Sequence, residues 1–368
     1  MKAPIPFLDL GRMPKQVQHT LYSSFKSFVQ KGVFSGGDPV NHLQESLQVW
    51  LKHPHIIPCA NGTDALEIAL RTIDIQPEDE VIVPAMTWVS TAEAVKLLGA
   101  KVKLIDVDRH GLMDLEQLEK LINEKTKAVI PVHLYGKMVK MDKLRSISEN
   151  KNIKVIEDAA QAFGASYLGK AAGTWGDIGC YSFYPSKNLG ALGEAGALAT
   201  ADADLAKKIQ CLTNHGQLIR DEHLMVGRNS KIDTIQAGFL NVLLQYFEQW
   251  QIKRKELSEY YLNSLSGIEG LVLPEGVLED SHNLHLFVIQ TPLRDQLREH
   301  LTASGIGTAI HYPQSLDAIQ PYRDKNEFPM ANKLSKEALS IPLNPFLKKH
   351  EAKIICKAIR SFFKKHSC

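Results

Sequence analysis

The 368-residue chain has few cysteines and no long apolar run. The five cysteines are odd in number, widely scattered and without CxxC or Cys/His ligand spacing, which argues against both a disulfide framework and a zinc site. No uncharged stretch approaches the ~20 residues needed to cross a bilayer, and the N-terminal residues lack an apolar run of signal-peptide length. We therefore expect a cytoplasmic protein with no metal and no membrane partner.

The sequence also lacks an excess of charge of one sign. Its 43 Lys and Arg residues face 41 Asp and Glu residues, and the net charge is +2. The short basic clusters are typical of solvated helix faces, and no basic stripe with interleaved aromatic residues indicates a nucleic-acid partner. No GxGxxG follows the first strand-like run, which disfavours a Rossmann dehydrogenase. The length and the hydrophobic content of 44% are typical of a globular enzyme with two domains.

Between residues 80 and 200, short β-branched runs alternate with helical patterns. This alternation predicts an α/β fold in which a mostly parallel sheet is flanked by helices. Ligands of such sheets collect at the carboxyl ends of the strands, so the residues after each run are the first candidates for a site. The runs are VIVPA, VKLIDVD, KAVIPVHLYG, KVIEDAA and IGCYSFY, which begin at residues 81, 102, 127, 154 and 178.

The C-terminal third of the chain is predicted to form a second, smaller α/β domain. We place the large domain at residues 1–249 and the small domain at residues 250–368, with a helical connector over 232–265 that breaks near Glu248. For the small domain the patterns predict strands at 284–290 and 307–312, a helix at 293–304 and a C-terminal helix over 348–364.

The segment NGTDALEIAL, residues 61–70, predicts a helix that begins after a Gly-Thr turn. Thr63 or Asp64 can cap this helix, and its apolar residues form one buried stripe. Free N–H groups and the helix dipole at such a start attract a phosphate. Plain capping without a ligand gives the same local sequence, so both interpretations stay open at this point.

Two carboxylates, Glu157 and Asp158, follow a buried apolar run in VIEDAAQAFGA. An unpaired carboxylate there is costly, so one of the two should have a cationic partner. In pyridoxal-phosphate enzymes an acidic residue pairs with the protonated pyridine nitrogen, and Asp158 is the candidate for this role. Gln161, one helical turn further on, is the candidate for a hydrogen bond to the ring hydroxyl. The alternative is an aspartate that only caps the next helix.

A lysine in a glycine-rich loop, Lys187, follows the run IGCYSFY. A lysine can form a Schiff base when burial or a neighbouring positive charge lowers the pKa of its amine. Ser182 can donate to a phosphate, and Trp88, after VIVPAMT, can stack on a pyridine ring. The alternatives are a solvated loop lysine and a core tryptophan. A helix start that can bind phosphate, an acidic residue and a lysine at one edge of the sheet together favour a pyridoxal-phosphate enzyme.

These stretches resemble the sugar aminotransferases of the DegT/StrS type, a family with the aspartate-aminotransferase fold (fold type I). The resemblance covers nearly the whole chain, and its most specific motifs contain Asp158, Gln161, Ser182 and Lys187. The matching stretches are NGTDALEIAL, VIVPAMTWVSTAEAVKLLGAKVKLIDVD, VIPVHLYG, VIEDAAQAFGA, GCYSFYPSKNLGALGEAGAL, NHGQ, VGRNSKIDTIQAGFL and AIHYP.

The resemblance implies a role for each residue around the cofactor ring. Lys187 matches the catalytic lysine that binds pyridoxal phosphate covalently, and Asp158 matches the partner of the pyridine nitrogen. Gln161 matches the contact of the ring hydroxyl, and Trp88 matches the stacking residue.

The resemblance also implies a homodimer with each active site at the subunit interface. Gly62, Thr63 and Ser182 match ligands of the phosphate. Asn229 matches an asparagine that reaches the phosphate from the neighbouring subunit, and His311 matches a residue on the sugar side.

The activity that the resemblance implies is transfer of the amino group of L-glutamate to a keto sugar, expected to be nucleotide-linked. The segments NHGQ and GRNSK resemble members that act on a 3-keto N-acetylhexosamine nucleotide, for surface polysaccharides or secondary metabolites. Related dehydratases replace the lysine with histidine, so Lys187 favours amino transfer. A dehydratase and a non-catalytic regulatory protein of the same fold are the alternatives.

Three positions depart from the family pattern. Lys231 stands where arginine is frequent, and this change gives up bidentate recognition of a carboxylate. Ser315 stands where proline is common, and Asp317 stands where histidine is common. These departures concern the substrate side and leave the cofactor residues unchanged.

Overall fold

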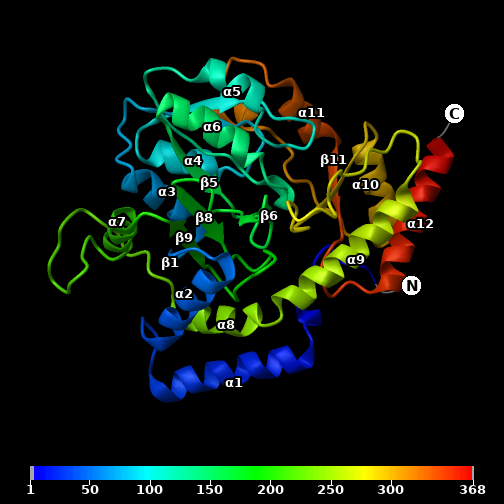
Figure 1. Cartoon of the computed structure of the whole chain (residues 1–368). Helices are drawn as coiled ribbons and strands as arrows, with labels where there is room; N and C mark the ends of the chain where they lie inside the picture. Colours follow the sequence, from blue (N-terminus) through cyan, green and yellow to red (C-terminus); the bar gives the residue numbers. More distant parts are fainter. Residues whose placement is uncertain (1–3, 367–368) are drawn as a thin grey trace.

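A seven-stranded sheet forms the centre of the computed structural model, which describes residues 4–366 (Figure 1). The strand order is β1-β9-β8-β5-β4-β2-β3, and β9 runs antiparallel to both of its neighbours while the other pairs are parallel. The mostly parallel sheet predicted from the sequence is therefore confirmed. Its strands are β1 (His55–Cys59), β2 (Glu80–Pro84), β3 (Lys101–Ile105), β4 (Thr126–Val129), β5 (Lys154–Asp158), β8 (Ile178–Ser182) and β9 (Gly196–Thr200).

Helices pack along this sheet, as predicted. One of them, α3, lies against β8 and β9, while α2 and α7 lie against β1. The helices of this part are α1 (Lys15–Lys31), α2 (Asp38–Leu51), α3 (Gly62–Thr72), α4 (Ser90–Leu97), α5 (Leu115–Leu121), α6 (Met141–Lys151), α7 (Ala203–Thr213) and α8 (Thr234–Leu244). The connections contain the 3-10 helices η1 (Leu10–Arg12) and η2 (Leu134–Gly136) and the short strands β6 (Ser166–Tyr167) and β7 (Lys170–Ala171).

Apolar β-branched residues fill the central strands because both faces of the sheet are covered. Val81, Ile82 and Val83 of β2 are fully buried. The strand β9, with the sequence GALAT, was not predicted because its small residues have little β-propensity. Close packing requires them, since a Cβ on Gly196 would lie 2.6 Å from the backbone of Asn61.

The elements that follow α8 contribute a two-stranded antiparallel sheet of β10 and β11 and a second apolar cluster. This cluster includes Tyr261, Phe287 and Ile359. The elements are α9 (Phe247–Leu265), β10 (Phe287–Gln290), α10 (Arg294–Ala303), η3 (Leu316–Ala318), η4 (Gln320–Tyr322), α11 (Pro329–Glu337), β11 (Ala338–Ile341) and α12 (Lys349–His366).

Helix α9 contributes to both apolar clusters. Phe247 and Trp250, near its start, belong to the cluster around the central sheet, whereas Tyr261 belongs to the second cluster. The predicted connector is broken between α8 and α9, close to the expected position. We propose that the large domain, residues 1–249, and the small domain, residues 250–368, meet within this helix.

The predicted strand at residues 307–312 is wrong. The chain there makes a single β-bridge, between Ala309 and Ser340. The N-terminal segment fills the adjacent space, since a Cβ on Gly307 would lie 2.7 Å from the backbone nitrogen of Phe7. The strand that pairs with β10 is β11, which the sequence patterns did not predict.

Among residues 4–366, no helix combines the length and the apolar character that a membrane crossing requires. The same residues contain no group of three or more His, Cys, Asp or Glu side chains placed to hold a metal ion. Four cysteines in this range are buried free thiols, and the fifth, Cys368, lies outside the described residues.

Candidate active site

A cavity of about 630 Å³ opens at the carboxyl ends of β2, β5 and β8, next to the start of α3. This is the edge at which an α/β sheet binds its ligands. Seven of the nine predicted site residues line the cavity, and Asn229 and His311 do not. The lining residues are Asn61, Gly62, Thr63, Leu66, Thr87, Trp88, Ser90, Val132, Asp158, Ala160, Gln161, Ser182, Tyr184, Ser186, Lys187, Glu194 and Tyr312.

The start of α3 forms one end of the cavity. The prediction that Thr63 or Asp64 caps this helix is wrong, because the side chain of Asn61 accepts from the backbone N–H of Asp64 at 2.8 Å. This cap leaves the N–H groups of Gly62 and Thr63 without an acceptor among the described residues. A Cβ on Gly62 would lie 2.8 Å from the Cβ of Ser182, so only glycine allows this close approach.

Three hydroxyl groups complete this end of the cavity. Thr63 Oγ1 and Ser90 Oγ lie 2.8 Å apart, and Ser182 Oγ accepts from the backbone N–H of Tyr184 at 3.3 Å. Free N–H groups, hydroxyl groups and the positive end of the α3 dipole thus lie at one end of the cavity, an arrangement that suits a phosphate group.

Asp158 ends β5 and lies at the bottom of the cavity, with 6% of its surface exposed. Thr91 Oγ1 donates to Oδ2 at 2.8 Å, and the backbone N–H of Ala160 donates to Oδ1 at 3.2 Å. Thr91 is in turn within 2.9 Å of Thr87. Burial raises the pKa of the Asp158 carboxyl, and the Thr91 hydrogen bond opposes this effect. No helix begins directly after Asp158, which removes the capping alternative.

The neighbouring carboxylate, Glu157, is bound entirely within the protein. The Nε2 atom of His133 lies 2.9 Å from one carboxylate oxygen, and His133 Nδ1 accepts from the backbone N–H of Val139. Three backbone N–H groups of residues 173–176 donate to the same carboxylate. Hydrogen bonds thus satisfy the Glu157 carboxylate in place of the predicted cationic partner, while Asp158 still faces the cavity.

Lys187 extends from the loop after β8 into the cavity. Its backbone N–H donates to the carbonyl of Tyr184, and a Cβ on Gly190 would lie 2.5 Å from the carbonyl oxygen of Pro185, so the loop is tightly folded. Burial lowers the pKa of the Lys187 amine to about 8, and the negative charge of Asp158 opposes this shift. The alternative of a solvated loop lysine is therefore wrong.

Gln161 and an aromatic pair form the opposite wall. The backbone N–H of Tyr135 donates to Gln161 Oε1 at 2.6 Å, and Gln161 Nε2 donates to the hydroxyl of Tyr312 at 2.9 Å. The Tyr312 ring lies 5.5 Å from the ring of Trp88, centroid to centroid. Trp88 is 55% exposed, so the alternative of a core tryptophan is wrong. Tyr312 was missed because its contact with Gln161 joins residues far apart in the sequence.

His311 and Asn229 do not line the cavity of their own chain. His311 Nδ1 lies 2.8 Å from Ser340 Oγ, and burial lowers the pKa of its imidazole to about 4. Asn229 is exposed, lies on the segment between α7 and α8, and forms an isolated β-bridge with Asn214.

The three departures from the family pattern also lie outside the cavity. Lys231 is exposed and forms an isolated β-bridge with Cys59. Ser315 Oγ lies 3.2 Å from Asn332 Oδ1, and Asn332 Nδ2 lies 3.4 Å from Asp317 Oδ2. Ser315 and Asp317 therefore share one local contact through Asn332.

Comparison with known proteins identifies the family. The profile of the DegT/DnrJ/EryC1/StrS aminotransferase family matches residues 16–360. The chain belongs to this family. It is 36% identical to the "Pleiotropic regulatory protein" of Geobacillus stearothermophilus, over 98% of this chain and 99% of that protein. It is 37% identical to the "UDP-2-acetamido-2-deoxy-3-oxo-D-glucuronate aminotransferase" of Pseudomonas aeruginosa, over 96% and 99% of the two chains.

The fold is also that of solved family structures. The crystal structure of S. venezuelae DesV in complex with a ketimine intermediate superposes with a TM-score of 0.95, at 33% identity, and 99% of each chain is covered. The predicted fold type I is therefore confirmed. The chain is a pyridoxal-phosphate-dependent sugar aminotransferase, as the sequence motifs predicted.

Proposed function

We propose that this aminotransferase moves the amino group of L-glutamate to the 3-keto group of a nucleotide-linked N-acetylhexosamine, for the synthesis of an amino sugar of a surface polysaccharide or secondary metabolite. The observation that carries the catalytic part is a cavity that joins the Lys187 amine, the Asp158 carboxylate and the start of α3. The Pseudomonas aeruginosa relative, whose name specifies a 3-oxo sugar nucleotide, supports the substrate class.

The residues of the cavity fit pyridoxal phosphate. The N–H groups of Gly62 and Thr63 and the hydroxyl of Ser182 would hold the phosphate. The close approach of residues 62 and 182 leaves no room for a Cβ at position 62. Asp158 would hold the proton on the ring nitrogen, and Gln161 would contact the ring hydroxyl. When bound, the cofactor supplies an electron sink for negative charge on the reacting carbon.

Lys187 would bind the cofactor and then move a proton. With a pKa of about 8, roughly a quarter of its amine is neutral at about pH 7.5, whereas an ordinary lysine is almost fully charged. A neutral amine is both a nucleophile and a general base. Burial raises the pKa of the Asp158 carboxyl, and the hydrogen bonds from Thr91 and Ala160 oppose this shift by favouring the charged form. Trp88 would cover the outer face of the ring.

A second subunit would complete the site, with Asn229 reaching the phosphate of its partner. Exposed apolar side chains support this homodimer, because the segment that carries Asn229 and the outer face of α1 both present them to solvent. On the segment they are Leu218, Ile219, Leu224 and Val226, and on α1 they are Tyr22, Phe25 and Val29. His311 and two of the departures from the family pattern, Lys231 and Asp317, would influence binding of the sugar or of the amino donor.

Two alternatives receive less support. The chain keeps lysine at position 187, where the dehydratases of the family carry histidine. A non-catalytic regulatory role would not require a lysine with a lowered pKa in a cavity together with a buried carboxylate. Both features favour amino transfer.

The proposal can be tested with isotope-labelled donor. The purified protein is incubated with pyridoxal phosphate, [15N]glutamate and a panel of keto sugar nucleotides, and the products are analysed by mass spectrometry. We expect 15N in the 3-amino derivative of the N-acetylhexosamine nucleotide and none with the Lys187→Ala variant. Loss of a sugar hydroxyl without uptake of 15N would indicate a dehydratase and contradict the proposal.

A further inference from the structure

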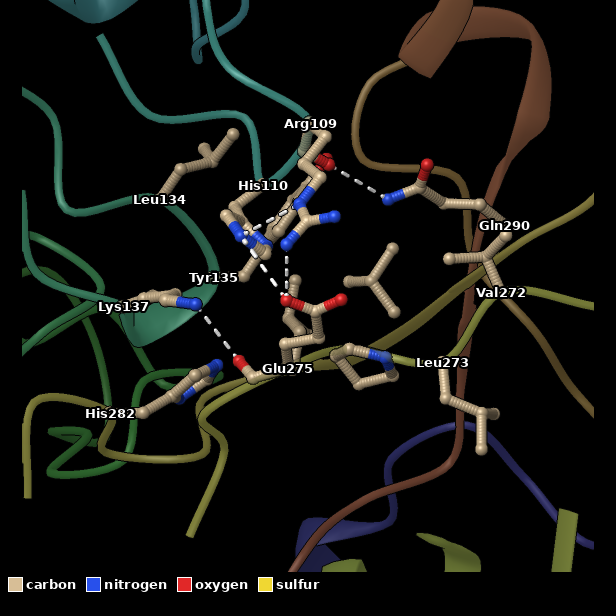
Figure 2. Close-up of a pocket in the computed structure, with 13 residues that line it drawn as sticks. Arg109, His110, Leu134, Tyr135, Lys137, Val272, Leu273, Glu275, His282 and Gln290 are labelled. Carbon is tan, nitrogen blue, oxygen red and sulfur yellow. Dashed lines mark hydrogen bonds and ion pairs between the residues drawn. The ribbon is translucent and has the colours of Figure 1, made fainter. Parts of the chain in front are cut away.

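Behind the candidate site, the chain segment of residues 272–290 lies against η2 and the turn after β3. Figure 2 shows the outer part of this contact, where Lys137 donates to the carbonyl of Glu275 at 2.9 Å and Arg109 pairs with its carboxylate at 2.6 Å. A small cavity of about 80 Å³ lies between these side chains. The Arg109 and Glu275 side chains are 67% and 56% exposed, so water screens their ion pair and it contributes little.

The inner part of the same contact is built on Asn283, which is 2% exposed. Its Nδ2 donates to the carbonyls of Gln161 at 2.8 Å and Phe163 at 2.9 Å. Its Oδ1 accepts from the backbone N–H of His285 at 2.9 Å. Both donors of the amide are used, so an isosteric aspartate could not replace the asparagine.

The backbone of Asn283 extends the network. Its N–H donates to the carbonyl of Gly136 at 3.0 Å, and its carbonyl accepts from Asn188 Nδ2 at 2.7 Å and Gln251 Nε2 at 2.8 Å. The fit is close, since a Cβ on Gly136 would lie 1.9 Å from Oδ1 of Asn283. Glycine is therefore required beside this asparagine.

This network ends on both sides of the candidate cofactor site. Asn188 follows Lys187 directly, and its Oδ1 lies 3.1 Å from Nδ1 of His285, whose pKa burial lowers well below its ordinary value, so that the neutral ring donates. On the other side, Asn283 holds the carbonyl of Gln161.

The backbone around this contact is strained. Tyr135 and Leu284 both adopt left-handed conformations, with φ of 61° and 58°, although neither is glycine. The N–H of Leu286 donates to the carbonyl of Tyr135, so the two strained segments are directly joined. Strain of this kind persists where the surrounding contacts determine the backbone, and it is frequent at functional sites.

We propose that Asn283 is a positioning residue that fixes Lys187 relative to Gln161, the two groups expected at opposite sides of the cofactor ring. The inference rests on the proposed function for the roles of these two residues. Asn283 does not line the cavity. It acts through Asn188 on the lysine loop and through the carbonyl of Gln161 on the opposite wall.

The test compares Asn283→Asp with Asn344→Asp. Asn344 is also a buried asparagine, 4% exposed, and its amide donates to the carbonyl of Phe7, away from the cavity. Two quantities are measured beside thermal stability: the dissociation constant of pyridoxal phosphate, and the pH dependence of Lys187 acetylation in the cofactor-free protein. We expect Asn283→Asp to weaken cofactor binding about tenfold or more and to shift the labelling profile by about 0.5 pH unit or more.

Asn344→Asp should lower the thermal stability and leave both other quantities unchanged. If Asn283→Asp also loses only stability, Asn283 has a purely structural role and the inference is wrong. If that variant does not fold, Asn188→Ala removes the side-chain bonds that join the lysine loop to Asn283, Gln251 and His285, and it should still shift the labelling profile. An unshifted profile contradicts the inference. A wild-type protein that takes up no cofactor would contradict the proposed function instead, because the labelling profile does not depend on the cofactor.

Discussion

The bottom of the active-site cavity and its rim are built in different ways. Gly62, Asp158 and Ser182 at the bottom lie at the ends of regular elements, and hydrogen bonds inside the chain fix their surroundings. Trp88 at the rim is 55% exposed, and Asn229, between α7 and α8, is also exposed. The difference indicates that the bottom determines the chemistry common to the family, whereas we propose that the rim and a second subunit complete the site and select the substrate.

The largest effect is expected from Lys187→Ala. Removal of the amine deletes both the covalent attachment and the proton transfer, so the rate of amino transfer should fall by about 10³-fold or more. The measurement is the initial rate of 2-oxoglutarate formation from glutamate. Lys143→Ala removes an exposed lysine of α6 and should keep full activity. Near-normal activity of Lys187→Ala would remove this residue from the mechanism.

The adjacent carboxylates allow a matched comparison at the bottom of the cavity. Asp158→Asn should lower the rate about 10²-fold, the order expected for one preorganised electrostatic contact, with a small change in stability. Glu157→Gln should instead lower the free energy of unfolding by roughly 3 kcal/mol, because its bonds to His133 and to residues 173–176 are internal. Rates and urea unfolding of both variants are measured. Similar rate losses in the two variants would contradict the separate roles.

The pH dependence of stability tests the burial of Lys187. Its pKa is about 8 in the folded protein against an ordinary value of 10.5, so the charged amine destabilises the fold below pH 8, and this cost disappears as the pH rises from 8 to 10.5. Lys187→Met should therefore be more stable than the wild type near pH 7, by at most about 3 kcal/mol. The difference should decrease between pH 8 and 10.5 in urea unfolding of cofactor-free protein. A constant difference would show that the amine is solvated.

The rim prediction concerns Asn229. Asn229→Ala should weaken cofactor binding about tenfold, as expected for one hydrogen bond to a charged group. Mixed dimers of one Lys187→Ala protomer and one Asn229→Ala protomer locate the effect. In this mixed dimer the protomer that keeps Lys187 lacks Asn229, and only its partner supplies an intact Asn229. Wild-type affinity for the cofactor at this site therefore indicates that Asn229 acts across the interface. Affinity as weak as in the Asn229→Ala homodimer would place the asparagine in its own subunit's site.

The bottom of the site could be predicted from the sequence because each residue has a local signal. Asp158 and Ser182 end apolar strands, Gly62 opens a helix, and Lys187 lies in a glycine-rich loop. Strand ends at one edge of a parallel sheet meet in space, so their order along the chain is enough.

The remaining residues have no local signal. Thr91 is on α4, and it reaches Asp158 only because β2 and β5 belong to one sheet. Tyr312 and Asn283 meet Gln161 through contacts more than 100 residues apart in sequence, which no periodicity reveals. The strands β9 and β11 were missed for the same reason. Whether a segment of small residues forms a strand depends on the segments with which it pairs rather than on its own β-propensity.

The most direct test of the account is a visible absorbance spectrum of the purified protein with pyridoxal phosphate, before and after glutamate, followed by borohydride reduction and peptide mapping. We expect a visible cofactor band that glutamate abolishes, and a reduced cofactor attached to Lys187 when glutamate is absent. A protein that takes up no cofactor, or one that carries the label on a different lysine, would contradict it.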